Sequence, residues 1–287
     1  MEKMENDKKA PVNRIIPFSN VDGPGNRMAV FFQSCPFRCY YCHNPETIHM
    51  CSSCGECVKT CPVGALSIQN GKVVWDSKIC VNCDTCIHTC KNLSSPKITF
   101  MTSEEIIQRV MEVRPFIRGL TVSGGECMNQ ADFLLELFTK LREKDPTLSL
   151  LIDSNGFTDF KKYEKLILLS DGVMLDVKAY DDSFHQYVCG VTNRTVLSNL
   201  DYLLSLHRLE EVRTVILPGF EKENELTVRN VSRIIQNQCR YKLLKYRYFG
   251  VRKEGVDIFG KVICPQGELE LMKEIAIENG ALKAVVI

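Results

Sequence analysis

Cysteine placement constrains this chain more than any other feature of its sequence. Eleven of the 15 cysteines among its 287 residues fall between Cys35 and Cys90. A secreted scaffold held by disulfides would be shorter and would spread its cysteines along the chain. Because a long cysteine-poor remainder follows the crowded segment, the grouping favours metal ligation by thiolates in a reducing cytosol, with disulfides as the minor alternative.

The charge balance argues against several classes of partner. The chain has 36 basic and 35 acidic residues and a net charge of +1, which gives no reason to expect a nucleic-acid or membrane surface. No apolar run approaches the ~18 residues of a membrane-spanning helix. Residues 1–9 are charged and lack the apolar stretch of a secretory signal. We therefore expect a cytoplasmic protein.

Strand-like and helix-like patterns alternate over most of the chain. After a first apolar run at 29–33, the predicted strands are 120–122, 148–152, 173–175, 212–217, 243–248 and 284–287. The predicted helices are 103–113, 130–144, 161–169, 196–209, 223–238 and 268–279, and Thr102 with Glu105 forms a capping-box signature before the first of them. This alternation predicts an α/β fold with a parallel sheet, either open or curled into a barrel.

Residues 47–97 interrupt the alternation and predict a small insert. The insert has eight cysteines, one strand-like stretch at 72–75, and two similar halves, CSSCGECVKTC and CVNCDTCIHTC. The predicted divisions are therefore residues 1–46 and 98–287, which together form the α/β domain, with residues 47–97 between them.

Each half of the insert has the spacing C-x2-C-x2-C-x3-C of bacterial two-cluster ferredoxins, in which the fourth cysteine ligates the other cluster. One [4Fe-4S] cluster is therefore assigned to Cys51, Cys54, Cys57 and Cys90, and a second to Cys80, Cys83, Cys86 and Cys61. Zinc ribbons are the alternative, but they use two CxxC pairs rather than this pattern.

The first cysteine group, Cys35, Cys39 and Cys42, supplies three thiolates where a closed cubane or a structural zinc needs four ligands. Three ligands leave one iron open to chelate the amino and carboxylate groups of an amino acid. The alternative is a zinc site completed by His43 or Cys51.

Polar residues gather where the predicted strands end, which is where parallel α/β sheets bind ligands. They are Cys35, Ser123 to Glu126, Asp153 to Asn155, Asp176 with Lys178, Arg213, and Lys245 with Arg247. Turns could explain the glycines and Asp153, and a salt bridge could explain Arg213. Their gathering at one end of one sheet favours a binding site facing the three cysteines.

The run CPFRCYYC resembles the radical S-adenosylmethionine (SAM) superfamily. More narrowly, nearly the whole chain resembles the glycyl radical enzyme activating enzymes, through VDGPGNRMAVFFQSCPFRCYYCHNPET, TVSGGE, DSNG, VMLDVKAY and HQYVCGVTN. The ferredoxin-type insert marks the longer members. IIPFSNVDGPG, GKVVW and CDTC look most like the YjjW-like branch, whose glycyl radical partner is of the YjjI-like type.

The resemblance implies a partial (β/α)6 radical SAM barrel with SAM across its top and an inserted ferredoxin-like domain with two [4Fe-4S] clusters. Cys35, Cys39 and Cys42 would hold the catalytic [4Fe-4S] cluster, the third in the chain. The implied SAM contacts are Tyr41, Cys42, His43, Gly124, Gly125, Glu126, Asp153, Ser154, Met174, Asp176, Val177, Lys178, Arg213 and Arg247. Asp153, Ser154, Met174 and Asp176 match positions that hold a monovalent cation in some members. Arg247 stands where relatives have a histidine near adenine.

The implied activity is reductive cleavage of SAM to methionine and a 5′-deoxyadenosyl radical, which abstracts a Cα hydrogen from a glycine of a partner glycyl radical enzyme. One electron from flavodoxin or ferredoxin would pass through the insert clusters, and we expect a monomer. Residues 22–25 are a candidate border of the path for the glycine loop, with a tight turn as the alternative. A radical SAM enzyme acting on a small molecule and a non-catalytic ferredoxin-type electron-transfer protein remain as other functions.

Overall fold

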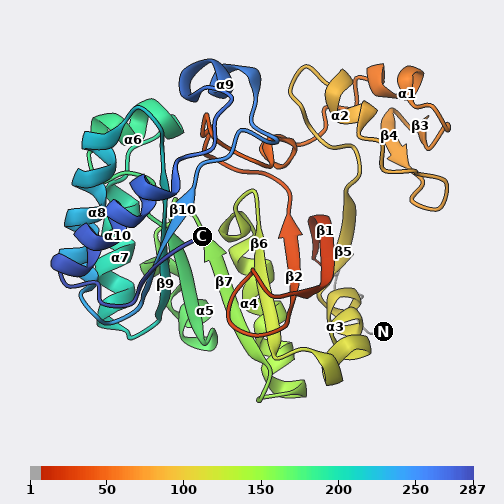
Figure 1. The fold of residues 1–287 in the computed structure, drawn as a ribbon. Helices are drawn as coiled ribbons and strands as arrows, with labels where there is room; N and C mark the ends of the chain where they lie inside the picture. The colour runs from red at the N-terminus through yellow and green to blue at the C-terminus, as the bar shows by residue number, and fades with distance from the viewer. Residues whose placement is uncertain (1–7) are drawn as a thin grey trace.

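Nine strands form one sheet in the computed structural model, which describes residues 8–287 (Figure 1). The expectation for residues 1–9 lies almost wholly outside the described residues. The strands of this sheet are β1 (Lys9–Ser19), β2 (Arg27–Phe32), β5 (Thr99–Thr102), β6 (Gly119–Gly124), β7 (Ser149–Ser154), β8 (Gly172–Asp176), β9 (Leu209–Ile216), β10 (Arg240–Lys245) and β11 (Ala284–Val286).

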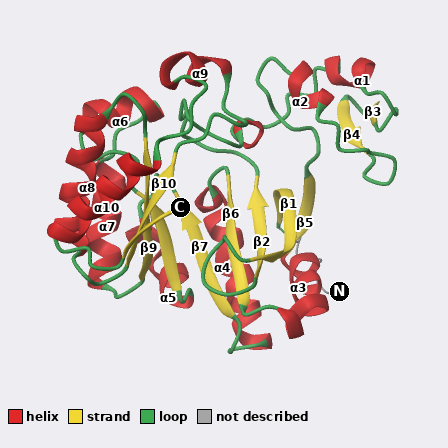
Figure 2. Ribbon diagram, viewed as in Figure 1, coloured by secondary structure: helices red, strands yellow, loops and turns green. Residues whose placement is uncertain are grey.

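Helices connect the parallel strands and pack along the sheet (Figure 2). They are α3 (Ser103–Val113), α4 (Ala131–Lys144), α5 (Glu164–Leu169), α6 (Asp182–Cys189), α7 (Arg194–Ser205), α8 (Glu221–Ile235), α9 (Lys253–Phe259) and α10 (Gln266–Glu278). The six predicted helices are confirmed as α3, α4, α5, α7, α8 and α10, and the predicted capping box at Thr102 is present. The sequence analysis does not predict α6 and α9. No helix of residues 8–287 has the length and apolar character required to cross a membrane.

The predicted parallel sheet is confirmed. Strands β2, β6, β7, β8, β9, β10 and β11 run parallel and lie side by side in chain order. The first six are the strands expected of a (β/α)6 arrangement, and β11 extends it. Since parallel strands end at one edge of a sheet, the polar residues that follow β2 and β6 to β9 are brought to the same edge.

Two antiparallel strands at the other edge are not predicted. β1 pairs with β2, and β5 pairs with β1. β1 has no continuous apolar pattern, because Pro11, Asn13 and Arg14 interrupt it. β5 has only four residues, which is too short for a clear pattern. These two strands tie residues 9–19 and 99–102 to the part of the sheet that carries the first cysteines.

The insert lies beside the main sheet rather than in it (Figure 1). It contains α1 (Glu56–Thr60), α2 (Thr85–Thr89) and the hairpin of β3 (Leu66–Gln69) with β4 (Lys72–Trp75), which confirms the predicted strand at 72–75. Its small core consists of Cys57, Leu66 and Cys86, with Trp75 packed against it. The domain boundaries at 47 and 97 stay a prediction.

A buried arginine holds the amino ends of the strands together. Arg27 has no solvent exposure, and it donates to Thr121 Oγ1 at 2.8 Å, Leu120 O at 2.8 Å and Ser149 O at 3.0 Å. Thr121 Oγ1 in turn donates to Asp22 O at 2.6 Å. Alternate strand residues share a face, so Asp22, the first of residues 22–25, lies on the face of β6 that carries Thr121 and Ser123. Whether residues 22–25 border the glycine path stays a prediction.

Arg27→Met should lower the free energy of unfolding by about 3 kcal/mol, because buried carbonyls of β6 and β7 lose a charged donor. Arg118→Met is the matched control: Arg118 is exposed, and its loss should change stability by less than about 0.5 kcal/mol. Urea unfolding followed by circular dichroism measures both. Equal effects of the two substitutions would contradict this role for Arg27.

Candidate active site

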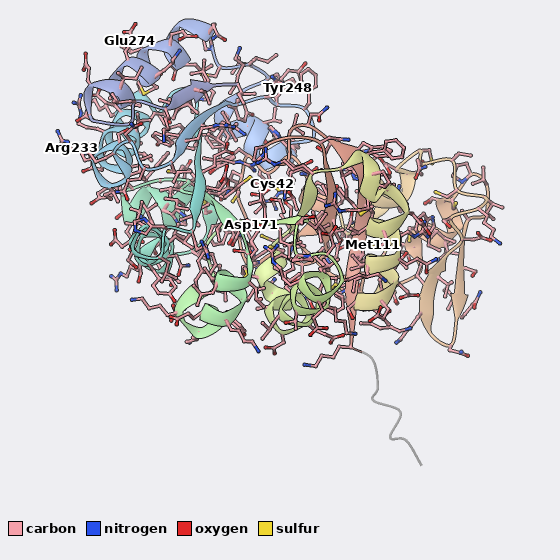
Figure 3. The ribbon with its side chains drawn as sticks, turned by 90° about the horizontal axis from the view of Figure 1, so that it is seen from below. Cys42, Met111, Asp171, Arg233, Tyr248 and Glu274 are labelled. Carbon is pink, nitrogen blue, oxygen red and sulfur yellow. The ribbon has the colours of Figure 1, made fainter. Side chains whose placement is uncertain are left out.

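The three-cysteine loop begins where β2 ends and is fixed by backbone hydrogen bonds on two sides. Cys35 N donates to Ile48 O at 3.0 Å, so the chain folds back beside the first cysteine. Tyr40 N donates to Val188 O at 2.9 Å, near the carboxyl end of α6. α6, which the sequence analysis does not predict, therefore positions the second half of the loop. Figure 3 shows Cys42 in the interior, with Arg233 and Glu274 at the outer rim.

Glycines allow the backbone of neighbouring elements to approach the loop. Gly124 has φ +125°, and a Cβ built on it would lie 2.2 Å from Phe32 O. A Cβ on Gly125 would lie 2.5 Å from Ser34 O, and one on Gly255 in α9 would lie 1.9 Å from Tyr40 O. The Gly-Gly-Glu run is thus more than a turn, because β6 can sit against the cysteine loop only without side chains there. No pattern in the sequence predicts the close approach of Gly255 to the backbone of Tyr40.

The three thiols occupy a largely buried, polar setting. Burial raises the pKa of Cys35 and raises that of Cys42 to about 11, whereas a hydrogen bond with Cys189 lowers the pKa of Cys39. Asn155 Nδ2 lies 3.4 Å from Cys35 Sγ. Three thiols on one loop with an amide donor beside them fit an iron–sulfur cluster held by three protein ligands.

The two residues considered as a fourth zinc ligand lie elsewhere. His43 is exposed, and its Nε2 lies 2.7 Å from Arg247 O. Cys51 lines a cavity of the insert with other cysteines. Arg247 itself has an exposed side chain and meets His43 through its backbone carbonyl, so an adenine contact by its guanidinium stays a prediction.

Arg213 is the centre of a buried charge network at the ends of β7, β8 and β9. Its Nη1 donates to both carboxylate oxygens of Asp153 at 3.0 Å, its Nε to Glu211 Oε1 at 2.6 Å, and its Nη2 to Met174 Sδ at 3.1 Å. Burial opposes its charge, but Asp153 and the other carboxylates outweigh it and raise the pKa of Arg213. Glu211 is 2% exposed and also pairs with Lys242 at 2.8 Å. Glu211 is not predicted from the sequence, where it looks like one acid of an ordinary Glu-Glu pair.

A second ion pair stands next to the cysteine loop. Lys178 Nζ donates to Asp176 Oδ2 at 2.8 Å and lies 5.8 Å from the centre of the Tyr41 ring. Burial opposes the charge of Lys178, yet Asp176 and the thiol of Cys39 raise its pKa well above the ordinary value. Val177 between them is buried, and its N donates to Arg213 O at 2.9 Å. The structure therefore brings the predicted residues of β8 and β9 together with the loop.

Glu126 is a buried carboxyl that receives three hydrogen bonds. The donors are Met128 N at 2.9 Å, Ser154 Oγ at 2.8 Å and Asn155 N at 2.7 Å. Burial outweighs these donors and raises the pKa of Glu126 from 4.5 to about 7. Glu126 thus links the Gly-Gly-Glu turn after β6 to the polar end of β7.

The insert cysteines surround two cavities in the two sets that the spacing predicts. Cys51, Cys54, Cys57 and Cys90 line a cavity of about 600 Å³. Cys61, Cys80, Cys83 and Cys86 line a second cavity of only about 20 Å³, so a cluster there requires these side chains to move apart. In residues 8–287 no three His, Cys, Asp or Glu side chains are close enough to hold a single metal ion. The thiols of the insert therefore line two cavities and do not converge on a single metal-ion position.

Comparison with known proteins defines the class of the fold and site. A family model described as the Radical SAM superfamily matches residues 29–233. Among solved structures, Streptococcus suis SuiB superposes with a TM-score of 0.56 at 10% identity, over 89% of this chain and 47% of that chain. A spore photoproduct lyase mutant superposes with a TM-score of 0.53 at 11% identity, over 96% and 80%. The fold and three-cysteine loop are those of a radical SAM protein.

Similarity to curated proteins identifies the family within the radical SAM superfamily to which the chain belongs. The Haemophilus influenzae relative is named a glycyl-radical enzyme activating enzyme and is 31% identical over 85% of this chain and 84% of its own. The indoleacetate decarboxylase activating enzyme of Tractidigestivibacter scatoligenes is 30% identical over 88% of both chains. The pyruvate formate-lyase-activating enzyme of Streptococcus mutans is 29% identical over 87% and 82%. The chain therefore belongs to the glycyl radical enzyme activating enzymes, which use an iron–sulfur cluster and SAM to generate a glycyl radical on a partner enzyme.

Glu126 should make stability depend on pH. Its folded pKa of about 7 exceeds the ordinary 4.5, so the folded chain binds the proton more tightly and loses stability as pH rises. Relative to Glu126→Gln, which lacks this titration, the free energy of unfolding of the natural chain should fall by roughly 2–3 kcal/mol between pH 5 and pH 8. Urea titrations across that range measure the difference. Parallel pH profiles for the two chains would contradict the raised pKa.

Proposed function

We propose that this chain generates a glycyl radical on its partner with SAM bound over the loop of Cys35, Cys39 and Cys42. The observation that carries the proposal is the position of this loop at the carboxyl edge of the sheet, beside the buried pairs of Arg213 and Lys178. Cys35, Cys39 and Cys42 would hold an iron–sulfur cluster, which would supply the one electron needed for reductive cleavage of SAM to methionine and the 5′-deoxyadenosyl radical.

The chain's own residues bind and orient SAM in this proposal. The backbone from Tyr41 to His43 contacts adenine. Gly124, Gly125 and Glu126 border the methionine amino group. Asp176, Val177 and Lys178 line the pocket, and Arg213 lies near the sulfonium. The support is that Tyr41, Glu126, Val177 and the charged pairs converge on the cysteine loop and are largely buried, which excludes water from a reactive radical.

A monovalent cation beside the SAM carboxylate belongs to the same proposal, with Asp153, Ser154, Met174 and Asp176 as its ligands. In this structure their oxygens and sulfur bond to Arg213, Glu126 and Lys178. A cation there would share the carboxylates of Asp153 and Asp176 with Arg213 and Lys178 or would replace these partners.

Residues 47–97 are proposed to form a ferredoxin-like insert with two [4Fe-4S] clusters, which brings the total to three. The support is that the two cavities are each lined by one of the expected four-cysteine sets. Cys54 and Cys83 are exposed, so each cluster would have an edge within reach of a flavodoxin or ferredoxin that donates the electron.

The partner is proposed to be a YjjI-like glycyl radical enzyme, with the chain acting as a cytoplasmic monomer. The support is the IIPFSNVDGPG, GKVVW and CDTC stretches. The family alone does not select the partner, because the names of relatives include activators of pyruvate formate-lyase and of indoleacetate decarboxylase.

Protein reconstituted anaerobically with iron and sulfide, reduced by dithionite and mixed with SAM and a YjjI-like enzyme should give the electron paramagnetic resonance doublet of a glycyl radical and release 5′-deoxyadenosine. Cys39→Ala should abolish both signals, because the catalytic cluster loses a ligand. The control Cys239→Ala changes a buried cysteine outside the cysteine clusters and should keep both. Deoxyadenosine without a radical on the partner would favour a small-molecule substrate, and neither product would favour an electron-transfer protein.

A separate experiment tests the electron path. Cys83→Ala should remove the iron of one insert cluster and slow flavodoxin-driven deoxyadenosine formation at least tenfold, while the dithionite-driven rate stays near that of the natural chain. The reason is that the small chemical reductant reaches the catalytic cluster directly, whereas a protein donor needs a cluster at the surface. Equal loss with both reductants would assign the insert a structural role instead.

A further inference from the structure

Two buried hydrogen-bond donors without partners line the two insert cavities. Among residues 8–287, six buried side-chain nitrogen and oxygen atoms have no hydrogen-bond partner, and Trp75 Nε1 and Ser94 Oγ are two of them. Trp75 lines the cavity of Cys61, Cys80, Cys83 and Cys86, and Ser94 lines the cavity of Cys51, Cys54, Cys57 and Cys90. Buried polar groups are nearly always paired, so an orphan donor beside a ligand cavity calls for an acceptor there.

The position of Trp75 limits where that acceptor can be. Trp75 ends the β3–β4 hairpin opposite Leu66 and packs on the small core of Cys57, Leu66 and Cys86. Its ring also borders a groove toward Asn13, but Nε1 itself is shielded from solvent. The cavity that Trp75 lines on the protein side is the one lined by Cys61, Cys80, Cys83 and Cys86, so a sulfur held there is a suitable acceptor for Nε1.

Ser94 is placed in the corresponding way on the other cavity. It is 2% exposed and lies four residues after Cys90, whose side chain lines the same cavity. The next residue, Ser95, bonds through its N to Glu46 O at 3.2 Å, which fixes this segment to the α/β domain. The hydroxyl of Ser94 is thus held on a short, anchored segment rather than on a free loop.

We propose that Trp75 and Ser94 are positioning residues, each donating one hydrogen bond to a sulfur of a different insert cluster and thereby raising that cluster's reduction potential. The inference rests on the two clusters of the proposed function. Thiolate and sulfide sulfurs accept hydrogen bonds, and such bonds are among the factors that set iron–sulfur potentials. A donor stabilises the reduced, more negative cluster more than the oxidised one, so its removal makes the cluster harder to reduce.

The expected effect is moderate and specific to each site. The net contribution of one hydrogen bond corresponds to about fivefold in an equilibrium constant. Trp75→Phe should therefore lower the ratio of reduced to oxidised cluster about fivefold at a fixed potential for one insert cluster, and Ser94→Ala should do so for the other. Lys97 also lines the Trp75 cavity, and its charge is paired with Asp84 at 2.5 Å; neither substitution removes a member of this pair, so it does not obscure the comparison.

Redox titration of the reconstituted holoenzyme, followed by electron paramagnetic resonance, measures both ratios. Each variant serves as the other's control, and iron and sulfide content is measured in parallel. The proposal is supported if each variant keeps the iron content of the natural chain and shows a shifted reduction potential for one insert cluster only. The shifted cluster must differ between the two variants. Unshifted couples at natural iron content overturn it. Iron sufficient only for the three-cysteine site in the natural chain also overturns it, but leaves glycyl radical formation, measured separately, untouched.

A labelling experiment on the natural sequence removes any dependence on how the variants fold. The chain has a single tryptophan, so biosynthetic [indole-¹⁵N]tryptophan labels Trp75 alone. Pulsed electron paramagnetic resonance of the reduced holoenzyme should show a ¹⁵N coupling and an exchangeable proton coupling from the indole. Absence of both couplings overturns the hydrogen bond of Trp75.

Discussion

The structure depends on how closely other backbone segments approach the three-cysteine loop. Residues 33–44 form neither a helix nor a strand, so their peptide groups need hydrogen-bond partners from other segments. Those partners come from residue 48, from the end of α6 and from the turn after β6. The approach is so close that a Cβ at Gly125 or Gly255 would collide with the loop backbone. These contacts fix the relative positions of elements that are far apart in sequence. The positions of the three thiols follow from that arrangement.

The charged residues next to the three-cysteine loop include both cations and carboxylates, so the site is not dominated by charge of one sign. Arg213 with Asp153, and Lys178 with Asp176, place each cation next to a carboxylate in a buried setting. Removing Lys178 would leave the carboxylate of Asp176 without its cation, which costs about 3–5 kcal/mol for a buried pair, whereas Arg213 keeps Glu211 as a partner if Asp153 is removed. A ligand that carries an ammonium, a carboxylate and a sulfonium has one net positive charge, and each of its charged groups can meet an oppositely charged partner in this set.

The sequence predicts the parts of this protein that follow periodic rules and misses those set by tertiary contact. The parallel strands and their helices have apolar patterns of sufficient length, and the ferredoxin spacing sorts eight cysteines into the sets that line the two cavities. β1 is missed because polar residues and a proline break its alternation, and α9 because Gly255 weakens a seven-residue helix. Glu211 and Cys189 are missed for a different reason: their roles come from the neighbours that folding gives them, Arg213 and Cys39. No spacing rule encodes those contacts.

The two kinds of cysteine site also differ in what holds them. The three-cysteine loop packs on a large core that continues through the sheet and its helices, and Cys39 and Tyr41 belong to that core. The insert has a core of three residues, Cys57, Leu66 and Cys86, and two of these are proposed ligands. So small a core cannot offset the entropy of ordering some fifty residues. The proposed clusters would therefore couple metal binding to folding of the insert and would supply the core that it lacks.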